Sequence, residues 1–340
     1  MGQEKLSKVF RHFGEVECKD SSPLYEHLSL KIADDDWLLG LSSHARQAQP
    51  VPNLLYGAVH YLLLKGKSHP LQQFYPSITR EAETPEGSFP QFKHFCKAYE
   101  TEIISILKTK NVQTNEVRRC AYLFPVFCCI FRKTNTPLSL IEIGTSAGLQ
   151  LLWDRFSYSY GDGKTYGSKD APLHLQTLVK NGKLTHLDAV PTVEERIGID
   201  LDICDLRNKE DYLWLRALIW PEHRDRVTNF EQAVKEYKKN PPKLMEGDGV
   251  KLLPSLAEQI PEKSALCIFH THVANQMTKE VKEELLEEIN KIGRNRNVFH
   301  IYNNIWDGKL HLDYYMDGTF HENTIGETDG HGRWFEWNLA

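Results

Sequence analysis

Hydrophobic positions divide the chain into a first part with helical spacing and a later part in which short apolar runs alternate with helices. Up to about residue 135, apolar residues recur every three or four positions, as on the buried face of an amphipathic helix. The segments 54–64 and 117–132 show this spacing most strongly, and the second follows the polar residues 113–116. Residues 1–135 are therefore predicted to form an N-terminal helical domain.

From residue 138 onward, several apolar runs have the length of buried strands, and helical patterns separate them. Strands are expected at 138–143, 197–201, 243–246, 265–269 and 297–302, and helices at 211–237, 252–260 and 278–292. Strands that alternate with helices predict a doubly wound, mainly parallel α/β sheet, here a Rossmann-like domain over 136–340. Residues 310–316 and 333–337 alternate in polarity and predict a terminal antiparallel pair, whereas 157–196 suggest only a hairpin or ordered loop.

The first predicted strand runs directly into a glycine turn and a further helical pattern. Leu138–Ile143 is apolar, Gly144 and Gly148 bracket a tight turn, and helical spacing of apolar residues begins at Ala147. Gly144 can turn the backbone with a positive φ, and Gly148 permits a close approach. We expect strand 138–143 to be central, flanked by parallel strands near 197–201 and 265–269, with its turn directed at a ligand.

Two kinds of chemistry fit this turn. Glu142, Gly144, Thr145, Ser146 and Gly148 match the acidic-x-Gly-x-x-x-Gly opening of class I S-adenosylmethionine methyltransferases, with Ser146 in place of the usual middle glycine. The same residues also read as G-x-S-x-G, the nucleophile elbow of a serine hydrolase. A close helix–strand contact that needs small residues is the third explanation. A dinucleotide oxidoreductase would require G-x-G-x-x-G, which the turn lacks.

The residues at the ends of the later strands favour the cofactor hypothesis. Ligands of open α/β sheets bind at the carboxyl ends of the strands. Asp200 is positioned to accept hydrogen bonds from the two ribose hydroxyls, and Asp248 from the adenine amine, although both could instead be helix N-caps. A hydrolase would need strands and an oxyanion loop before the elbow, where this chain is helical, but a triad of Ser146, Asp248 and either His270 or His272 is formally allowed.

Two further groups of polar residues are candidates for the site. His270 and His272 follow the strand 265–269, where they would act as a base and its orienting partner, or lie in the core or at the surface. The second group is a polar cluster formed by Gln113, Asn115, Glu116 and Arg119. This cluster would close over the cofactor edge of the sheet as a lid that contacts substrate, or else form a helix cap with charges in the first helical turn.

Composition and charge narrow the choice of partners. The chain has 340 residues and a net charge of −5, which gives no argument for nucleic-acid binding. The longest apolar run, 121–131, is well short of the roughly 20 residues that span a bilayer, and the polar N-terminus has no signal-peptide pattern. Seven cysteines without C-x-x-C indicate reduced thiols in a cytoplasmic protein, and scattered histidines do not predict a metal site.

Several segments resemble a family of bacterial proteins, known as a domain of unknown function, whose core is similar to class I methyltransferases. The segments that carry the resemblance are 58–63, 113–120, 144–149, 196–200, 220–221 and 247–248. The resemblance supports the methyltransferase-like fold more than any reaction, and the acceptor, expected to be a small molecule, cannot be read from the chain. We therefore expect an S-adenosylmethionine-binding, methyltransferase-like protein. The alternatives are a Ser146 hydrolase and a non-catalytic ligand-binding protein on the same fold.

Overall fold

A computed structural model describes residues 2–339, which divide into two compact units. The first unit contains the chain up to Thr114 together with Arg207–Thr228. The second contains Asn115–Leu206 and the chain from Asn229 onward. This division differs from the sequence-based boundary at residue 135, because it assigns residues 115–135 to the second unit and returns 207–228 to the first.

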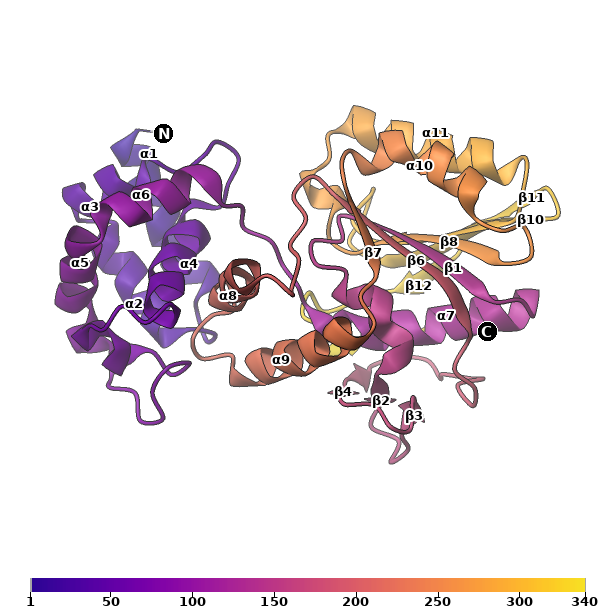
Figure 1. Cartoon of the computed structure of the whole chain (residues 1–340), viewed down its shortest axis with the longest axis horizontal. Coiled ribbons are helices and arrows are strands. Elements are labelled where there is room, and N and C mark those ends of the chain that lie inside the picture. The colour runs from indigo at the N-terminus through magenta and orange to yellow at the C-terminus, as the bar shows by residue number, and fades with distance from the viewer. Residues whose placement is uncertain (1, 340) are drawn as a thin grey trace. The chain divides into compact units, whose positions relative to one another are not determined.

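The first unit is helical, as the spacing of its apolar residues predicted. Its elements are α1 (Gln3–His12), the π-helix η1 (Phe13–Glu17), α2 (Pro23–Ile32), α3 (Asp36–Ser42), α4 (Val51–Leu64), the 3-10 turns η2 (Pro70–Phe74) and η3 (Pro85–Gly87), α5 (Ser88–Ala98), α6 (Glu100–Thr109) and α8 (Lys209–Ala217) (Figure 1). The core includes packed aromatic rings, with Tyr25 stacked on Tyr56 at 4.2 Å between ring centroids. Glu222 fastens the returning segment to α2 by accepting hydrogen bonds from the Ser22 hydroxyl and the Leu24 amide.

The second unit is built on a mostly parallel central sheet. Its strands are β1 (Leu138–Ile143), β6 (Val193–Asp200), β7 (Lys243–Glu246), β8 (Ala265–His270), β9 (Val298–Tyr302), β10 (Leu310–Met316), β11 (Thr319–His321) and β12 (Thr324–Gly326). Their order is β11-β10-β9-β8-β1-β6-β7, and β12 pairs with β10. Strand β1 pairs in parallel with β6 and with β8, so that Ile141 lies between Ile197 and Ile268. The expected parallel neighbours of the central strand are therefore confirmed.

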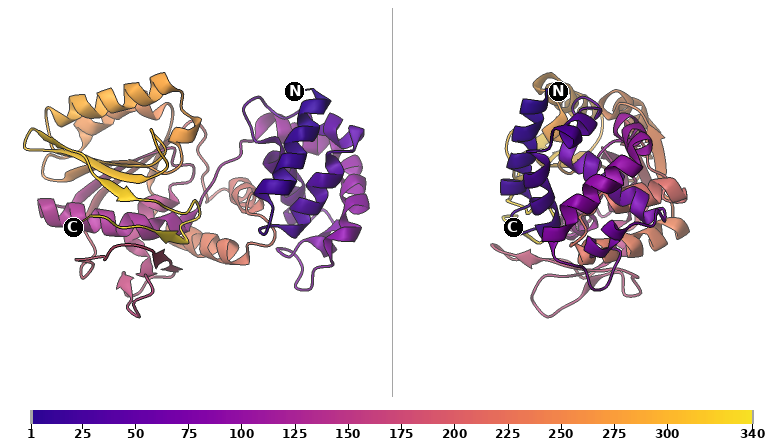
Figure 2. Two further views of the ribbon diagram at one scale, coloured as in Figure 1. Left: turned by 180° about the vertical axis from the view of Figure 1, so that it is seen from behind. Right: turned by 90° about the vertical axis from the view of Figure 1, so that its left-hand side faces the viewer.

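The strands that follow β1 in the sequence lie on both sides of it in the sheet. It first adds β6 and β7 on one side of β1, and then returns to add β8 and β9 on the other side. Strands β6–β7 and β8–β9 are parallel pairs, whereas β10 runs antiparallel to β9. Seen from behind in Figure 2, the C-terminal strands β10 and β11 form the outer edge of this sheet. The connection after β1 leads to β6 on one side of the sheet, and the connection after β8 leads to β9 on the other side. The strand order thus reverses between β1 and β8.

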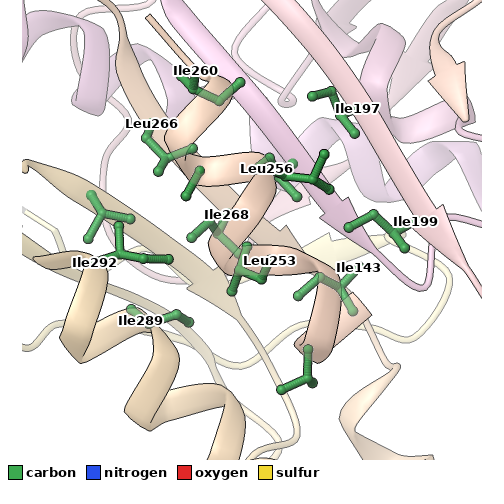
Figure 3. Packing of buried hydrophobic residues seen from close by; sticks show 14 of the residues in the cluster. Ile143, Ile197, Ile199, Leu253, Leu256, Ile260, Leu266, Ile268, Ile289 and Ile292 are labelled. Atoms are coloured by element: carbon green, nitrogen blue, oxygen red, sulfur yellow. The ribbon is translucent and has the colours of Figure 1, made fainter. Parts of the chain in front are cut away.

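Helices cover both faces of the sheet. On one face lie α10 (Gly249–Gln259) and α11 (Lys279–Gly293), whose Leu253, Leu256 and Ile289 pack on the isoleucines of β1, β6 and β8 (Figure 3). On the other face lies α7 (Cys120–Thr134), which is preceded by the 3-10 turn η4 (Val117–Arg119). Burying each such side chain stabilises the fold by about 1.5–3 kcal/mol. Between residues 2 and 339 no helix has the length and hydrophobicity needed to cross a bilayer.

Aromatic side chains fix α7 to the sheet. Phe127 stacks on Trp153 at 4.5 Å between ring centroids and meets Phe269 of β8 edge-on at 5.5 Å. Phe124 stacks on Tyr158 at 4.6 Å. The predicted helical segment 211–237 forms two helices, α8 and α9 (Arg224–Lys239), and Pro221 lies between them.

Three local expectations need correction or completion. The residues after Gly148 form the 3-10 helix η5 (Leu149–Arg155) rather than an α-helix, and Leu152 within it has non-helical angles (φ −99°, ψ 15°). The expected antiparallel pair of 310–316 with 333–337 is wrong, because β13 (Trp334–Phe335) pairs in parallel with β5 (Leu178–Val179). The segment after η5 contains β2 (Ser157–Ser159), β3 (Tyr166–Gly167) and β4 (His174–Gln176), and β2 and β3 are antiparallel.

Candidate functional site

The loop after β1 has left-handed backbone conformation at every second residue. Gly144, Ser146 and Gly148 have φ values of +71°, +52° and +73°. A Cβ added at Gly144 would lie 2.3 Å from Val273 Cγ2, and one at Gly148 would lie 2.8 Å from Leu244 Cδ2. Both positions therefore require glycine, for conformation and for space, as the sequence predicted. Ser146 holds the same conformation with a side chain and is strained.

Backbone hydrogen bonds fasten this loop to the end of β6. The amides of Gly144 and Thr145 both donate to the carbonyl of Ile199, at 2.8 and 3.1 Å. The amide of Ser146 donates to Asp200 Oδ2 at 2.7 Å, and the other oxygen of Asp200 accepts from the amide of Asp202 at 3.1 Å. Each carboxylate oxygen offers two lone pairs, so these two hydrogen bonds do not exhaust the capacity of Asp200 to accept. Burial raises the pKa of Asp200.

Glu142 is a second carboxyl group beside this loop. Its side chain is buried, and Thr145 Oγ1 donates a hydrogen bond to Oε2 at 2.5 Å. Burial is the main cause that raises the pKa of Glu142 to about 8, and the negative charge of Asp200 adds to it, whereas the Thr145 hydroxyl and Arg119 oppose it. Glu142 is therefore largely protonated at neutral pH. Two carboxyl groups with raised pKa values at adjacent strand ends are typical of functional sites.

The hydroxyl of Ser146 contacts an amide rather than either candidate imidazole. Asn115 Nδ2 donates to Ser146 Oγ at 2.8 Å. His270 is fully buried, with Nε2 3.2 Å from His300 Nε2 and with Nδ1 unpartnered. His272 contacts Asn304 through Nδ1, and its Nε2 has no hydrogen-bond partner. Neither histidine is hydrogen-bonded to Ser146, so the triad that a hydrolase requires is not assembled.

The two histidines differ in their surroundings. His270 is the last residue of β8, and burial lowers its pKa to about 4. His272 lies two residues beyond the strand, with φ +58°. Burial, helped by the positive charge of Arg119, lowers the pKa of His272 to about 3. Both imidazoles are therefore neutral at physiological pH, and His270 occupies the position of a core histidine.

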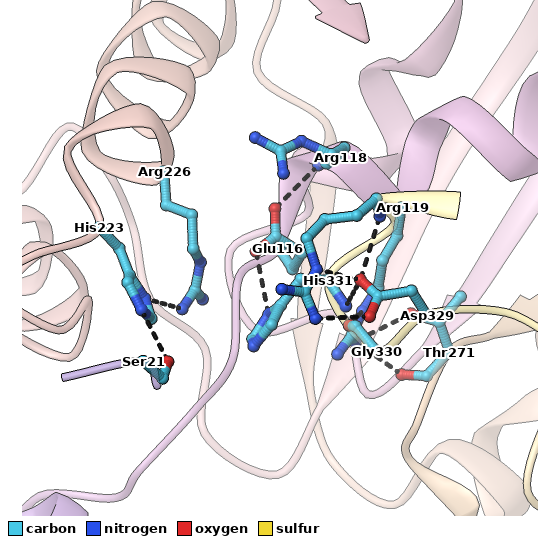
Figure 4. Close-up of polar contacts among 11 residues, drawn as sticks. Ser21, Glu116, Arg118, Arg119, His223, Arg226, Thr271, Asp329, Gly330 and His331 are labelled. Atoms are coloured by element: carbon cyan, nitrogen blue, oxygen red, sulfur yellow. Dashed lines mark hydrogen bonds and ion pairs between the residues drawn. The ribbon is translucent and has the colours of Figure 1, made fainter. Parts of the chain in front are cut away.

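Arg119 and Glu116 join the end of β8 to a loop near the C-terminus (Figure 4). Arg119 Nε donates to the carbonyl of Gly330 at 2.9 Å, and its guanidinium also donates to the carbonyl and hydroxyl of Thr271, both at 3.3 Å. Glu116 Oε2 lies 3.3 Å from His331 Nδ1. Arg119 and Glu116 are buried. Of the predicted polar cluster, Arg119 thus lies at the end of β8, and Glu116 lies beside the loop 329–332.

The two remaining predicted site residues are Asp248 and Gln113. Asp248 is the N-cap of α10, where Oδ1 accepts from the amides of Val250 at 3.0 Å and Lys251 at 3.4 Å. This is the capping role that the sequence left open as an alternative. Gln113 belongs to the first unit and is half-buried in an irregular segment.

The structure also adds residues that the sequence did not reveal. Leu201, directly after Asp200, is 75% exposed, which is unusual for a leucine at a strand end. Thr271 and Asn303 are buried at the ends of β8 and β9. Two of these features can be recognised in the sequence: the apolar Leu201 follows an acid at a strand end, and the pair Asn303-Asn304 follows a predicted strand. The contribution of Gly330 cannot be recognised there, because Arg119 reaches it across 211 residues of chain.

Two cavities lie away from this loop. Their volumes are about 290 and 560 Å³, residues between 154 and 196 line them, and they share Ser168 and Val190. The residues of the loop 144–148 line neither cavity. Over the described range 2–339, no group of three or more His, Cys, Asp or Glu side chains is arranged to hold a metal ion.

Comparison with known proteins places the chain in a family. A search of curated proteins found no match. The model of a family described as "Uncharacterized protein conserved in bacteria (DUF2332)" matches residues 7–337, and this chain therefore belongs to that family.

Proposed function

We propose that the second unit binds S-adenosylmethionine, or its demethylated product, over the ends of β1 and β6, and that the protein is methyltransferase-like with a small-molecule acceptor. The observation that carries the proposal is the glycine loop 144–148 bonded to the Asp200 carboxylate at the point where the strand order reverses. In chain order the parallel strands lie 3-2-1-4-5 across the sheet, an order that supports nucleotide binding at this point.

The residues of the loop suggest how the cofactor would be held. Asp200 would accept the ribose hydroxyls with its remaining lone pairs. The exposed side chain of Leu201 would supply an apolar surface for the adenine ring. Asp248 would accept from the adenine amine through Oδ2, the oxygen outside the α10 cap, which lies 3.7 Å from Lys251 Nζ.

The acceptor would bind on the β8 side of the loop. Asn115, Glu116, Arg119 and His272 are the polar groups available there. The position of His270 inside the sheet, with no exposed surface, gives it no part in the proposal. No observation favours Ser146 as a nucleophile. A methyl-transfer assay distinguishes a methyltransferase from a protein that binds the cofactor without catalysis.

Isothermal titration calorimetry with S-adenosylmethionine and S-adenosylhomocysteine tests the proposal. The wild-type protein should bind at one site, and Asp200→Asn should weaken binding by about tenfold or more, because the neutral amide accepts hydrogen bonds poorly. The exposed change Asp170→Asn is the matched control and should leave binding unchanged. Gly144→Asp is unsuitable, since its Cβ would clash with Val273 whether or not a ligand binds. Absence of binding to the wild-type protein would overturn the proposal.

A further inference from the structure

The turns that follow β8 and β9 share an unusual backbone conformation. His272, two residues after β8, and Asn304, two residues after β9, have φ values of +58° and +64°. A positive φ is uncommon outside glycine, although asparagine and histidine adopt it more readily than most residues. Hydrogen bonds hold both turns.

The β9 turn holds His272 at two points. Asn303 Oδ1 accepts a hydrogen bond from the backbone amide of His272 at 2.7 Å. Asn304 Nδ2 lies 3.2 Å from His272 Nδ1. The amide nitrogen of asparagine only donates, so Nδ1 accepts and the single proton of the neutral ring lies on Nε2. Burial keeps the pKa of His272 at about 3, so the ring stays neutral. His272 is thus a fixed N–H donor.

The asparagine turn is itself held in place. Lys282 Nζ, from α11, donates to the carbonyls of Asn304 at 3.2 Å and Ile305 at 2.8 Å. Ile305 is buried in a small apolar cluster with Ala274 and Tyr302. The side chain that orients His272 is therefore preorganised by the fold.

Two buried donors at these turns have no partner. His272 Nε2 and Asn303 Nδ2 are both buried without a hydrogen bond, and Asn303 has no exposed surface. An unpaired buried donor is unfavourable, so a group that supplies an acceptor here is favoured. The Arg119 guanidinium contacts Thr271, the neighbour of His272 in the chain, and adds positive charge. Donors beside a guanidinium suit an anionic oxygen such as that of a carboxylate.

We propose that the ends of β8 and β9 bind the carboxylate of a small organic acid, through the donors His272 Nε2 and Asn303 Nδ2, with Asn304 as the positioning residue. Naming this ligand as the methyl acceptor rests on the proposed function, whereas the carboxylate contact does not. Gly330 lies beside the ring, since a Cβ added there would be 4.0 Å from His272 Cε1. The loop 329–332 therefore lies against the His272 ring, and it would have to make room for a ligand bound there.

Nitrogen-15 NMR of histidine-labelled protein, with acetate as the probe, tests the contact without any cofactor. Before acetate is added, the His272 signals should show the proton on Nε2. Acetate should then shift the Nε2 signal with saturation. A proton on Nδ1, or an Nε2 signal that acetate leaves unchanged, would overturn the proposal.

Asn304→Gly separates positioning from folding. Glycine adopts the left-handed conformation freely, so the turn should survive while the contact to Nδ1 is lost. Acetate affinity should fall by about tenfold, as for loss of one orienting hydrogen bond. The exposed Asn135, at φ +51° after α7, gives the matched control Asn135→Gly, which should change nothing. An unchanged affinity in Asn304→Gly would refute the positioning role.

Changes at His272 test the donor itself. His272→Gln places an amide N–H near the position of Nε2 and should retain weaker acetate binding, whereas His272→Gly relieves the backbone and should abolish it. Saturable acetate binding that persists in His272→Gly would reveal an unrelated surface site and contradict the proposal. Calorimetry with S-adenosylmethionine on the same variants measures cofactor binding at the loop 144–148 independently of acetate binding. A failed cofactor titration beside a positive acetate titration would thus count against the proposed function alone.

Discussion

Single side chains at the end of β1 occupy conformations and environments that the rest of the fold must stabilise. Glu142 is a buried carboxyl group, and Ser146 is a non-glycine residue with a left-handed backbone. Both lie in the segment whose spacing predicted a ligand-binding turn. Their physical consequences are measurable without knowing the ligand.

Glu142 should make stability depend on pH. The folded protein holds the Glu142 proton up to about pH 8, whereas the unfolded chain releases it near the ordinary value of 4.5. The contribution of Glu142 to the free energy of unfolding is therefore fully present below pH 4.5. It is lost as the pH rises toward 8, and the free energy of unfolding falls by about 1.4 kcal/mol per pH unit over this range. Urea unfolding at a series of pH values should show this slope in the wild-type protein and its loss in Glu142→Gln. Parallel profiles for the two proteins would refute the assignment.

Ser146→Gly should stabilise the loop and preserve cofactor binding. Glycine relieves the left-handed strain at φ +52°, and the amide that donates to Asp200 is retained. The lost contact is the hydrogen bond from Asn115. We expect calorimetric affinity for S-adenosylmethionine to change by less than about threefold. A serine-directed phosphonate should not label the wild-type protein, and labelling at Ser146 would instead revive the hydrolase alternative.

At the scale of elements, the sequence predicted what local patterns determine. The apolar run 138–143 and Gly144 were sufficient to place β1 and its turn, because buried strands and positive φ have local signatures. The 3-10 form of η5 and the pairing of β13 with β5 were missed, because neighbouring structure decides them. The same holds for the site. Asp200 follows a readable strand, but the contact of Arg119 with Gly330 depends on the complete fold.

Asp248 shows how one residue can satisfy two interpretations of a sequence. Because Oδ1 caps α10, Asp248→Ala should lower the free energy of unfolding by about 1 kcal/mol. Asp248→Asn keeps a capping oxygen and should lower it much less. Chemical denaturation measures both effects. If both variants bind S-adenosylmethionine like the wild-type protein, Asp248 is a cap alone, whereas weaker binding by Asp248→Asn at full stability assigns it to the adenine.

At the scale of the whole molecule, each of the two units consists of two separate segments of the chain, so the sequence order alone does not indicate the division. Residues 115–135 carry a helical pattern continuous with the helices before them, so the sequence placed them in the N-terminal domain. Their aromatic residues nevertheless pack on the sheet of the second unit, with Phe127 between Trp153 and Phe269. Hydrophobic periodicity identifies a helix but not the sheet or helices that it will cover.

Two shortened chains test where the second unit begins. Both join residue 206 to residue 229 through a flexible Gly/Ser linker and end at residue 340, but one starts at 115 and the other at 136. The longer fragment retains α7, so it should unfold cooperatively and show native near-ultraviolet circular dichroism. The shorter one exposes Trp153 and Phe269 and loses Phe124 and Phe127. Since each buried phenylalanine typically contributes about 3–5 kcal/mol and a domain has only about 5–15 kcal/mol in total, the shorter fragment should not fold. Native spectra from the fragment that starts at 136 would restore the boundary that the sequence indicated.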